Sequence, residues 1–257
     1  MKVIVNINKS LEENAGIYYD RVKKLKKKAE RAKEAVRQNE QKLTALLENK
    51  KQLETLHKEE KLKRTPQWHE KFRWFISSEG FLIIGGRDAT TNEIIIKKYT
   101  DNSDIVFHTE AAGSPFFVIK TDGKKPGKET LDEAAQAVAS YSRAWKLGLS
   151  TIEVFYVNPD QLSKTPKAGE FISKGSFMSY GKKNHLTPKI ELAVGSMPNS
   201  IIMGGPVNAV KKHCTKFVLL EFGKEKTSKA AKYIQAKIGG ELDEIIKVIP
   251  AGGVKVR

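Results

Sequence analysis

Cysteine is almost absent from this sequence. The 257 residues contain a single one, Cys214, so no disulfide can form within the chain. A metal cluster built on cysteine ligands is excluded for the same reason. Such sparing use of cysteine is typical of proteins that reside in a reducing compartment.

Long apolar runs are absent as well. No stretch of 18 or more apolar residues is present, and the N-terminal sequence MKVIVNINKS lacks both the apolar core and the cleavage site of a secretory signal. The sequence therefore predicts a soluble, cytoplasmic protein with no membrane-spanning segment.

Proline is missing from residues 10–64, where Gly16 is the only glycine. Lys, Glu, Ala, Leu, Gln and Arg dominate this segment, and all of them favour helix. Ser10 and Glu13 have the spacing of a capping box, which predicts the start of a helix, and Pro66 predicts its end. We expect one long helix in a coiled-coil arm that spans residues 1–66.

The apolar residues of this arm recur at alternating spacings of four and three, the pattern of a coiled-coil seam. They are Leu11, Ala15, Tyr18, Val22, Leu25, Ala29, Ala32, Val36, Leu43, Leu46 and Leu53. The register passes through Asn39 without a slip, which favours one continuous helix over a helical hairpin, although Asn39, Lys50 and His57 put polar side chains in the seam. A helix with a single apolar stripe requires a partner helix, either a missing N-terminal half or a second copy of the chain.

Acidic residues are too few to balance the basic ones. The chain has 46 Lys or Arg against 30 Asp or Glu, a net charge of +16, and residues 1–64 hold half of that excess. This charge indicates a polyanionic partner, either nucleic acid or an acidic membrane surface. A dense basic face on the arm is either the solvated side of a coiled coil or a phosphate-contacting surface, and the net charge favours the second; its residues are Arg21, Lys23, Lys24, Lys26, Lys27 and Lys28.

The composition changes at Trp68, where aromatic and β-branched residues begin to alternate with glycine and proline. Residues 67–187 are predicted to form a mixed or antiparallel α+β domain. The expected helices are a short one capped by Thr91, whose residues 94–96 are also compatible with strand, and a longer one over residues 129–147. The expected strands cover residues 72–76, 81–84, 104–108, 116–120, 151–157 and two short segments around residues 173–180.

Residues 188–257 are predicted to form a small α/β C-terminal extension. Its strands are expected at residues 190–194, 201–203 and 217–222, and its helices at residues 206–212, 228–238 and 241–249, before a glycine-rich tail. The pattern does not decide between a separate subdomain and a continuation of the first sheet.

Catalytic patterns are scarce. His108, Ser114 and Asp104 supply the residue types of a hydrolytic triad, but no nucleophile elbow of the form GxSxG is present. The five histidines show no metal-ligand spacing on a helix. We therefore expect no enzyme activity, no metal and no cofactor.

Lysines, in contrast, recur at predicted turns, where cations are exposed and can approach phosphates. Two aromatic residues, Phe177 and Tyr180, lie among these lysines and would either stack on unpaired bases or contribute to the core. The lysines are Lys164, Lys174, Lys182 and Lys183, with further ones in residues 124–128 and 211–212.

The stretch from Trp68 to Asp88, together with Asp104–His108, Gly113–Ser114 and Gly175–Asn184, resembles the NFACT RNA-binding domain over most of residues 68–186. The arm also resembles this family: Val5-Asn-Ile followed by Asn14-Ala15 and Tyr18-Tyr19 is similar to the start of the second helix of the family's coiled-coil arm. The part after Pro188, with Gly204-Gly-Pro206, resembles the C-terminal extension of the archaeal form.

The family comprises ribosome quality-control factors related to the nuclear export mediator factor, with archaeal and fibronectin-binding-A-like bacterial relatives. The resemblance implies binding to large ribosomal subunits obstructed by peptidyl-tRNA, through rRNA and tRNA. The N-terminal globular domain and the helix-hairpin-helix segment, which the family associates with tail synthesis, are not in this sequence. We therefore expect a C-terminal fragment or a split-gene product that does not elongate a stalled chain by itself.

The matched motifs place Arg87, His108 and Ser114 among the expected RNA-binding residues, beside Lys164, Lys174, Lys182 and Lys183. Each motif residue also has a structural interpretation: Arg87 braces a turn, His108 is a hydrogen-bonded core histidine, and Ser114 caps a bend. The alternative for the whole chain is a coiled-coil interaction protein whose globular part binds DNA or another protein.

Overall fold

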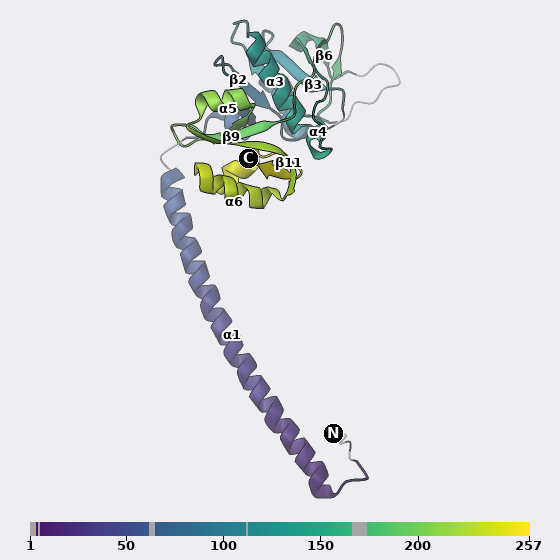
Figure 1. The fold of residues 1–257 in the computed structure, drawn as a ribbon, viewed down its shortest axis with the longest axis vertical. Coiled ribbons are helices and arrows are strands. Elements are labelled where there is room, and N and C mark those ends of the chain that lie inside the picture. The colour runs from purple at the N-terminus through teal and green to yellow at the C-terminus, as the bar shows by residue number, and fades with distance from the viewer. Residues whose placement is uncertain (1–3, 5, 62–64, 112, 166–173) are drawn as a thin grey trace. The chain divides into compact units, whose positions relative to one another are not determined.

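The computed structural model describes residues 4, 6–61, 65–111, 113–165 and 174–257, and the side chains of its long helix as far as residue 48. The chain divides into two compact units, residues 1–66 and residues 67–257. Figure 1 shows the long helix of the first unit and the sheets and helices of the second.

The first unit is dominated by a single helix, α1 (Leu11–Lys61). The predicted capping box is confirmed: the Ser10 hydroxyl accepts a hydrogen bond from the Glu13 amide at 3.1 Å, and the Glu13 carboxylate accepts one from the Ser10 amide at 2.9 Å. The single long helix is also confirmed. Its predicted end at Pro66 follows residues 62–64, which lie outside the described residues.

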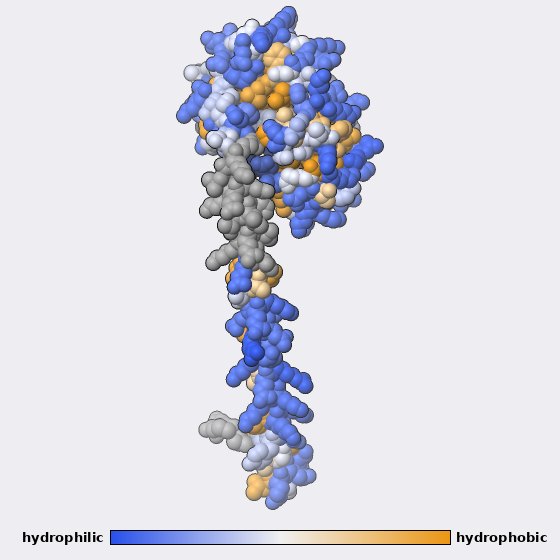
Figure 2. All heavy atoms as spheres, turned by 90° about the vertical axis from the view of Figure 1, so that its left-hand side faces the viewer, coloured by the Kyte–Doolittle hydropathy of each residue, from blue (hydrophilic) through white to orange (hydrophobic). Residues whose placement is uncertain are grey.

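The predicted seam of α1 is exposed to solvent in this chain. Leu25 is 56% exposed, Leu43 57% and Leu46 65%, and Figure 2 shows isolated hydrophobic side chains on an otherwise hydrophilic helix surface. Leucine side chains at this exposure gain little from the hydrophobic effect. The seam positions Lys50, Leu53 and His57 fall outside the described side chains.

The second unit is built on a six-stranded antiparallel sheet in the order β1-β2-β4-β3-β5-β8. The predicted hairpin at its edge is confirmed, with Trp74 opposite Ile84 and a turn closed by Gly80 at φ +93°. The strands are β1 (Arg73–Ile76), β2 (Leu82–Gly85), β3 (Ile105–Thr109), β4 (Phe117–Lys120), β5 (Val154–Val157) and β8 (Asn184–Leu186).

Three helices accompany this sheet: α2 (Ala89–Lys98), α3 (Lys128–Tyr141) and the single turn α4 (Arg143–Lys146). Helix α3 packs on β3, β4 and β5 through a small-residue face that includes Ala134 and Val138. The sheet and its helices enclose a core centred on Phe75, Phe107 and Phe117.

Two predicted helix boundaries in this region are wrong. The cap of α2 is Asp88 rather than Thr91: the Asp88 carboxylate accepts the Thr91 amide at 2.8 Å, and Thr91 is the third helical residue. The helix expected over residues 129–147 is broken at Ser142, whose ψ of 177° is extended. Its hydroxyl donates to the Ala139 carbonyl at 2.7 Å and accepts the Ala144 amide at 3.1 Å, ending α3 and starting α4.

The region expected to hold two short strands around residues 173–180 begins outside the described residues. Its described part, residues 174–180, contains one strand, β7 (Met178–Ser179), which pairs with β6 (Leu162–Ser163). The next strand along the chain is β8, at the edge of the large sheet. Short single-turn helices, η1 (Trp68–Lys71) and η2 (Pro159–Gln161), precede β1 and β6.

The last 70 residues form a second antiparallel sheet in the order β10-β9-β11-β12. The glycine-rich tail contains a strand that the sequence analysis did not expect: residues 254–256 form β12, and the Gly253 carbonyl before it accepts the Trp145 indole N–H at 3.1 Å. The elements are β9 (Leu192–Ser196), β10 (Ile202–Gly205), α5 (Val207–His213), β11 (Lys216–Glu225), α6 (Thr227–Ile238), α7 (Leu242–Val248) and β12 (Val254–Val256).

The two sheets share buried residues. Met203 of β10 and Val210 of α5 belong to the core of the large sheet, whereas Trp145 of α4 belongs to the core around Leu220 and Ile234. These shared side chains fix α4 at the junction of the sheets, beside the cavity described next. The division into residues 67–187 and 188–257 stays a prediction.

Candidate nucleic-acid interface

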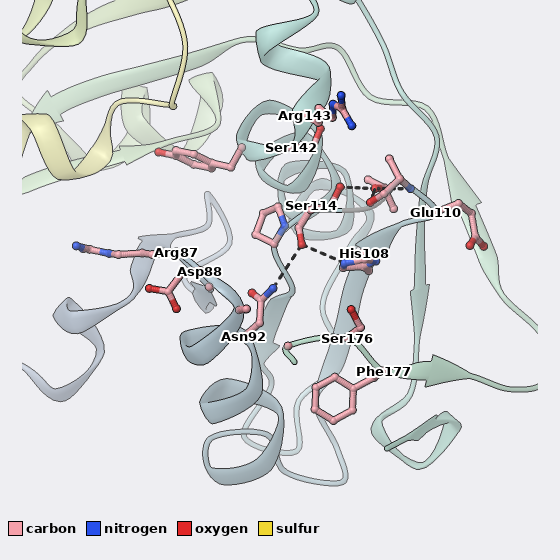
Figure 3. A pocket seen from close by; sticks show the side chains of 18 of the residues that line it. Arg87, Asp88, Asn92, His108, Glu110, Ser114, Ser142, Arg143, Ser176 and Phe177 are labelled. Carbon is pink, nitrogen blue, oxygen red and sulfur yellow. Dashed lines mark hydrogen bonds between the residues drawn. The ribbon is translucent and has the colours of Figure 1, made fainter. Parts of the chain in front are cut away.

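A cavity of about 900 Å³ opens in the second unit where five segments meet. The segments are the turn after β2, the start of α2, the loop between β3 and β4, the junction of α3 and α4, and the residues before β7. Figure 3 shows Ser114 between Asn92 and His108 on one wall, with Ser142 and Arg143 above it in this view. Four residues predicted for the site line the cavity: Arg87, His108, Ser114 and Lys174.

Arg87 is held by the backbone of the segment before β1. Its guanidinium donates hydrogen bonds to the carbonyl oxygens of Phe72 at 2.9 Å and Glu70 at 3.3 Å. Burial lowers the pKa of Arg87 from its usual value. The geometry therefore matches the structural interpretation of Arg87, which braces the turn at η1.

His108 and Ser114 are both hydrogen-bonded within the protein. The His108 Nε2 lies 3.1 Å from the Ser114 carbonyl oxygen, and its ring stacks on Phe116 with centroids 4.0 Å apart. The Ser114 side chain is buried and its hydroxyl bonds to that of Thr109. Burial lowers the pKa of His108, so the neutral imidazole forms this wall of the cavity at neutral pH.

These contacts do not form a hydrolytic triad. His108 meets the backbone carbonyl of Ser114 and not its hydroxyl, and the Asp104 carboxylate accepts the Thr121 amide at 3.0 Å and binds Lys120. A triad needs the histidine hydrogen-bonded to both the nucleophile and the carboxylate. The three residues hold the ends of β3 and β4 together.

Two of the predicted basic residues are already neutralised. The Lys164 ammonium lies 3.2 Å from the Glu93 carboxylate and 4.9 Å from the centre of the Phe177 ring. The Lys183 ammonium pairs with Glu110 and lies 4.4 Å from the centre of the Phe155 ring. Phe177 also packs edge to face against Phe116, so its ring is partly engaged in protein contacts.

The other two predicted lysines are available to a ligand. Lys174 and Lys182 are exposed, and within the described part of the chain neither ammonium forms a hydrogen bond or an ion pair. Lys174 lines the cavity, whereas Lys182 lies in the turn before β8.

Arg143 and Lys146 of α4 are cavity-lining cations that the sequence interpretation missed. Both are exposed and, among the residues described, have no ion pair. A spacing of three within a predicted amphipathic helix would have placed them on one face. The break at Ser142 changes the direction of the helical turn that carries them. Apolar periodicity in the sequence does not reveal this break.

Asn92, which the sequence analysis did not select as a site residue, also lines the cavity. Its amide donates to the Ser114 carbonyl at 3.4 Å, and its oxygen accepts the Phe116 amide at 3.2 Å. A Cβ at Gly86 would lie 1.8 Å from the Asn92 oxygen, so only glycine fits there.

The basic face of α1 lies in the other unit. All six cations are exposed, and none forms an ion pair within the described residues; they are Arg21, Lys23, Lys24, Lys26, Lys27 and Lys28. Exposed cations without partners keep their full charge for a polyanion.

The described residues contain no candidate metal site and no candidate membrane span. No group of three or more His, Cys, Asp or Glu side chains there has a geometry that would hold a metal ion. No described helix combines the length and the apolar character that crossing a bilayer requires.

Comparison with known protein families identifies the domain that contains the cavity. Residues 71–181 match the NFACT protein RNA binding domain. This chain contains an NFACT RNA-binding domain and is homologous to the ribosome quality-control factors that share it. The resemblance noted in the sequence is thereby confirmed.

Relatives of known identity match beyond this domain. The chain is 43% identical over 204 residues to the archaeal Rqc2 homolog aRqcH of Methanocaldococcus jannaschii, an alignment that covers 76% of this chain and 30% of the relative. It is 39% identical over 176 residues to the ribosome quality control complex subunit NEMF of Mus musculus, covering 68% of this chain and 16% of the relative. The chain thus spans less than a third of the length of either protein.

A solved structure, the C-terminal part of the fibronectin/fibrinogen-binding protein from Streptococcus suis, is 21% identical to the chain with a TM-score of 0.39. It covers 49% of this chain and 47% of that one.

Proposed function

We propose that this chain is the RNA-binding part of a ribosome-associated quality-control factor that recognises large ribosomal subunits obstructed by peptidyl-tRNA. The observation that carries the proposal is the NFACT RNA-binding domain itself, matched over residues 71–181. The names of the archaeal and mouse relatives, both ribosome quality-control proteins, support the ribosomal setting. A cytoplasmic location follows from that partner.

In this proposal the contacts to rRNA and tRNA are made through phosphates. The predicted cations that support this are the ones with no partner among the described residues: Lys174 and Lys182 in the second unit and the basic face of α1 in the first. Phosphate contacts release counterions and give affinity without sequence preference. Arg87, His108 and Ser114 support the surface that carries these cations, because each of them forms a side-chain hydrogen bond within the protein.

The proposal concerns binding and assigns no chain elongation to this chain. In it, the apolar seam of α1 pairs with a second helix, supplied by a longer form of the factor or by a second copy. The exposed side chains of Leu25 and Leu43 support that requirement, because an apolar stripe stabilises a helix only when it is buried against another element.

Cosedimentation with purified large ribosomal subunits tests this function. We expect the chain to pellet more strongly with subunits that carry peptidyl-tRNA than with empty subunits. A variant with the six cations of the α1 basic face replaced by Gln should bind both kinds of subunit less tightly than the wild type. Equal binding to both kinds of subunit would contradict recognition of the obstructed state.

Crosslinking with sequencing in cells separates the proposal from its alternative. Recovery of large-subunit rRNA and tRNA is expected. Recovery of DNA, or of protein without nucleic acid, would favour the coiled-coil interaction protein instead.

A further inference from the structure

We infer that the cavity beside α4 binds a single unpaired nucleotide of an RNA strand, with its phosphate against Arg143, Lys146 and Lys174. This inference rests on the proposed RNA-binding function and names the ligand of one site within it. Three features carry it: the distribution of paired and unpaired charges, the preformed wall, and the size of the cavity.

The charges of the cavity leave its cations in excess. Its two carboxylates are engaged: Asp88 caps α2 through the Thr91 amide at 2.8 Å, and Glu110 pairs with Lys183. Its two inner arginines are held by protein groups through part of each guanidinium: Arg87 donates to the Phe72 carbonyl, and Arg73 donates to the Gly86 carbonyl and lies 4.7 Å from the centre of the Tyr141 ring. The Nε of each arginine has no hydrogen-bond partner among the described residues.

Three cavity cations remain without a partner among the described residues, and all three are exposed: Arg143, Lys146 and Lys174. They come from two segments, α4 and the residues before β7. Cations from separate segments around one opening favour an anion that bridges them, and a phosphodiester is such an anion.

The walls of the cavity are fixed before any ligand arrives. The Ser114 carbonyl is held from two sides by Asn92 and His108. Two glycines allow close backbone approach: a Cβ at Gly86 would meet Asn92, and a Cβ at Gly175 would lie 2.4 Å from the Ala89 carbonyl oxygen. A preformed cavity binds without the entropic cost of ordering its walls.

Size distinguishes an unpaired nucleotide from a duplex. About 900 Å³ is within the range of cavities that enclose a small ligand. It accommodates a nucleotide that is splayed out of a strand, but the bases of a duplex stay stacked and paired and cannot enter. Loops, bulges and single-stranded ends of rRNA or tRNA supply such nucleotides.

The test uses the full chain and a fluorescein-labelled ten-nucleotide single-stranded RNA, with the matched RNA duplex and free AMP as comparison ligands. The variant is Arg143→Ala with Lys146→Ala, both exposed and therefore tolerant of substitution. The matched control is Lys226→Ala with Lys232→Ala, which removes the same charge from exposed positions of the second unit that do not line the cavity. Unchanged thermal melting confirms that each variant folds.

We expect the cavity variant to lose about tenfold in affinity for the single-stranded RNA. Its affinity for the RNA duplex should equal that of the control variant. Lys174→Ala should weaken single-strand binding in the same direction. Equal losses on strand and duplex, or a loss no greater than the control's, would overturn the inference and leave the proposed RNA binding intact.

Free AMP separates the two sources of a nucleotide. If the chain binds AMP weakly and the single-stranded RNA tightly, the cavity recognises a nucleotide that is part of an RNA strand. AMP binding as tight as that of the strand would overturn the inference in favour of a free-nucleotide site. Failure of the wild-type chain to bind any RNA would overturn the proposed function as well.

Discussion

The guanidinium of Arg87 donates a hydrogen bond to the carbonyl oxygen of Phe72 at 2.9 Å, joining the turn after β2 to the segment before β1. Phe72 is 1% exposed, so this carbonyl has no access to water. Replacing Arg87 leaves a buried acceptor unsatisfied.

Arg87→Ala should therefore lower the free energy of unfolding by about 2 kcal/mol, with little effect on the salt dependence of RNA binding. Chemical denaturation and a salt titration of tRNA affinity measure the two effects. A variant of unchanged stability that loses salt dependence would instead make Arg87 a phosphate ligand.

His108 should make stability depend on pH. Burial lowers the pKa of His108 in the folded state below its usual 6.5, so the unfolded state binds the proton more readily. The stabilising contribution is then fully present above about pH 6.5 and is lost as the pH falls towards the folded-state pKa.

His108→Gln keeps a donor for the Ser114 carbonyl but removes the titration. Denaturation from pH 7.5 down to pH 5 should show a smaller decline in stability for this variant than for the wild type. Parallel declines would mean that other groups account for the acid sensitivity.

Lys182 and Lys183 should behave differently although they are neighbours. Lys182 is unpaired among the described residues, whereas Lys183 pairs with Glu110 and lies over Phe155. Lys182→Ala should reduce both tRNA affinity and the salt slope, because one free phosphate contact is lost. Lys183→Ala, the matched control, should change the salt slope of tRNA affinity less than Lys182→Ala does. Identical salt slopes for both variants and the wild type would show that the turn before β8 is not part of the RNA interface.

The seam of α1 should mediate helix pairing. Replacing Leu25 and Leu43 with Asn should decrease helix content and any concentration-dependent association in ultracentrifugation, because a paired seam is the main stabilising interaction of such a helix. Replacing Lys23 and Lys27 with Gln is the control and should leave both unchanged. A wild-type chain that stays monomeric at every concentration would rule out self-pairing.

Much of the fold was predictable because apolar periodicity reports which residues are buried. The hairpin of β1 and β2 and the strands β3 and β4 follow from their aromatic and β-branched runs, and the capping box fixed the start of α1 at Leu11. Strand β12 was not predictable, since three residues after a glycine pair acquire strand structure only by pairing with β11.

The site was predictable only in part. Sequence motifs predicted Arg87, His108 and Ser114 as RNA-binding residues. The three line one cavity in the structure, and their hydrogen bonds brace its walls. Arg143 and Lys146 were missed because Ser142 reads as an ordinary helical residue; the break there depends on a side chain that bonds to Ala139 and Ala144. Whether a lysine is free or paired, as with Lys174 and Lys164, is a property of the tertiary structure.

The central claim is that this chain binds RNA through its unpaired cations. The most direct measurement is the affinity of the full chain for tRNA as salt is raised from about 50 to about 200 mM. We expect the logarithm of the affinity to fall linearly with the logarithm of the salt concentration, with a loss of at least about tenfold in affinity over this range. An affinity that stays constant across the titration would contradict phosphate-driven binding.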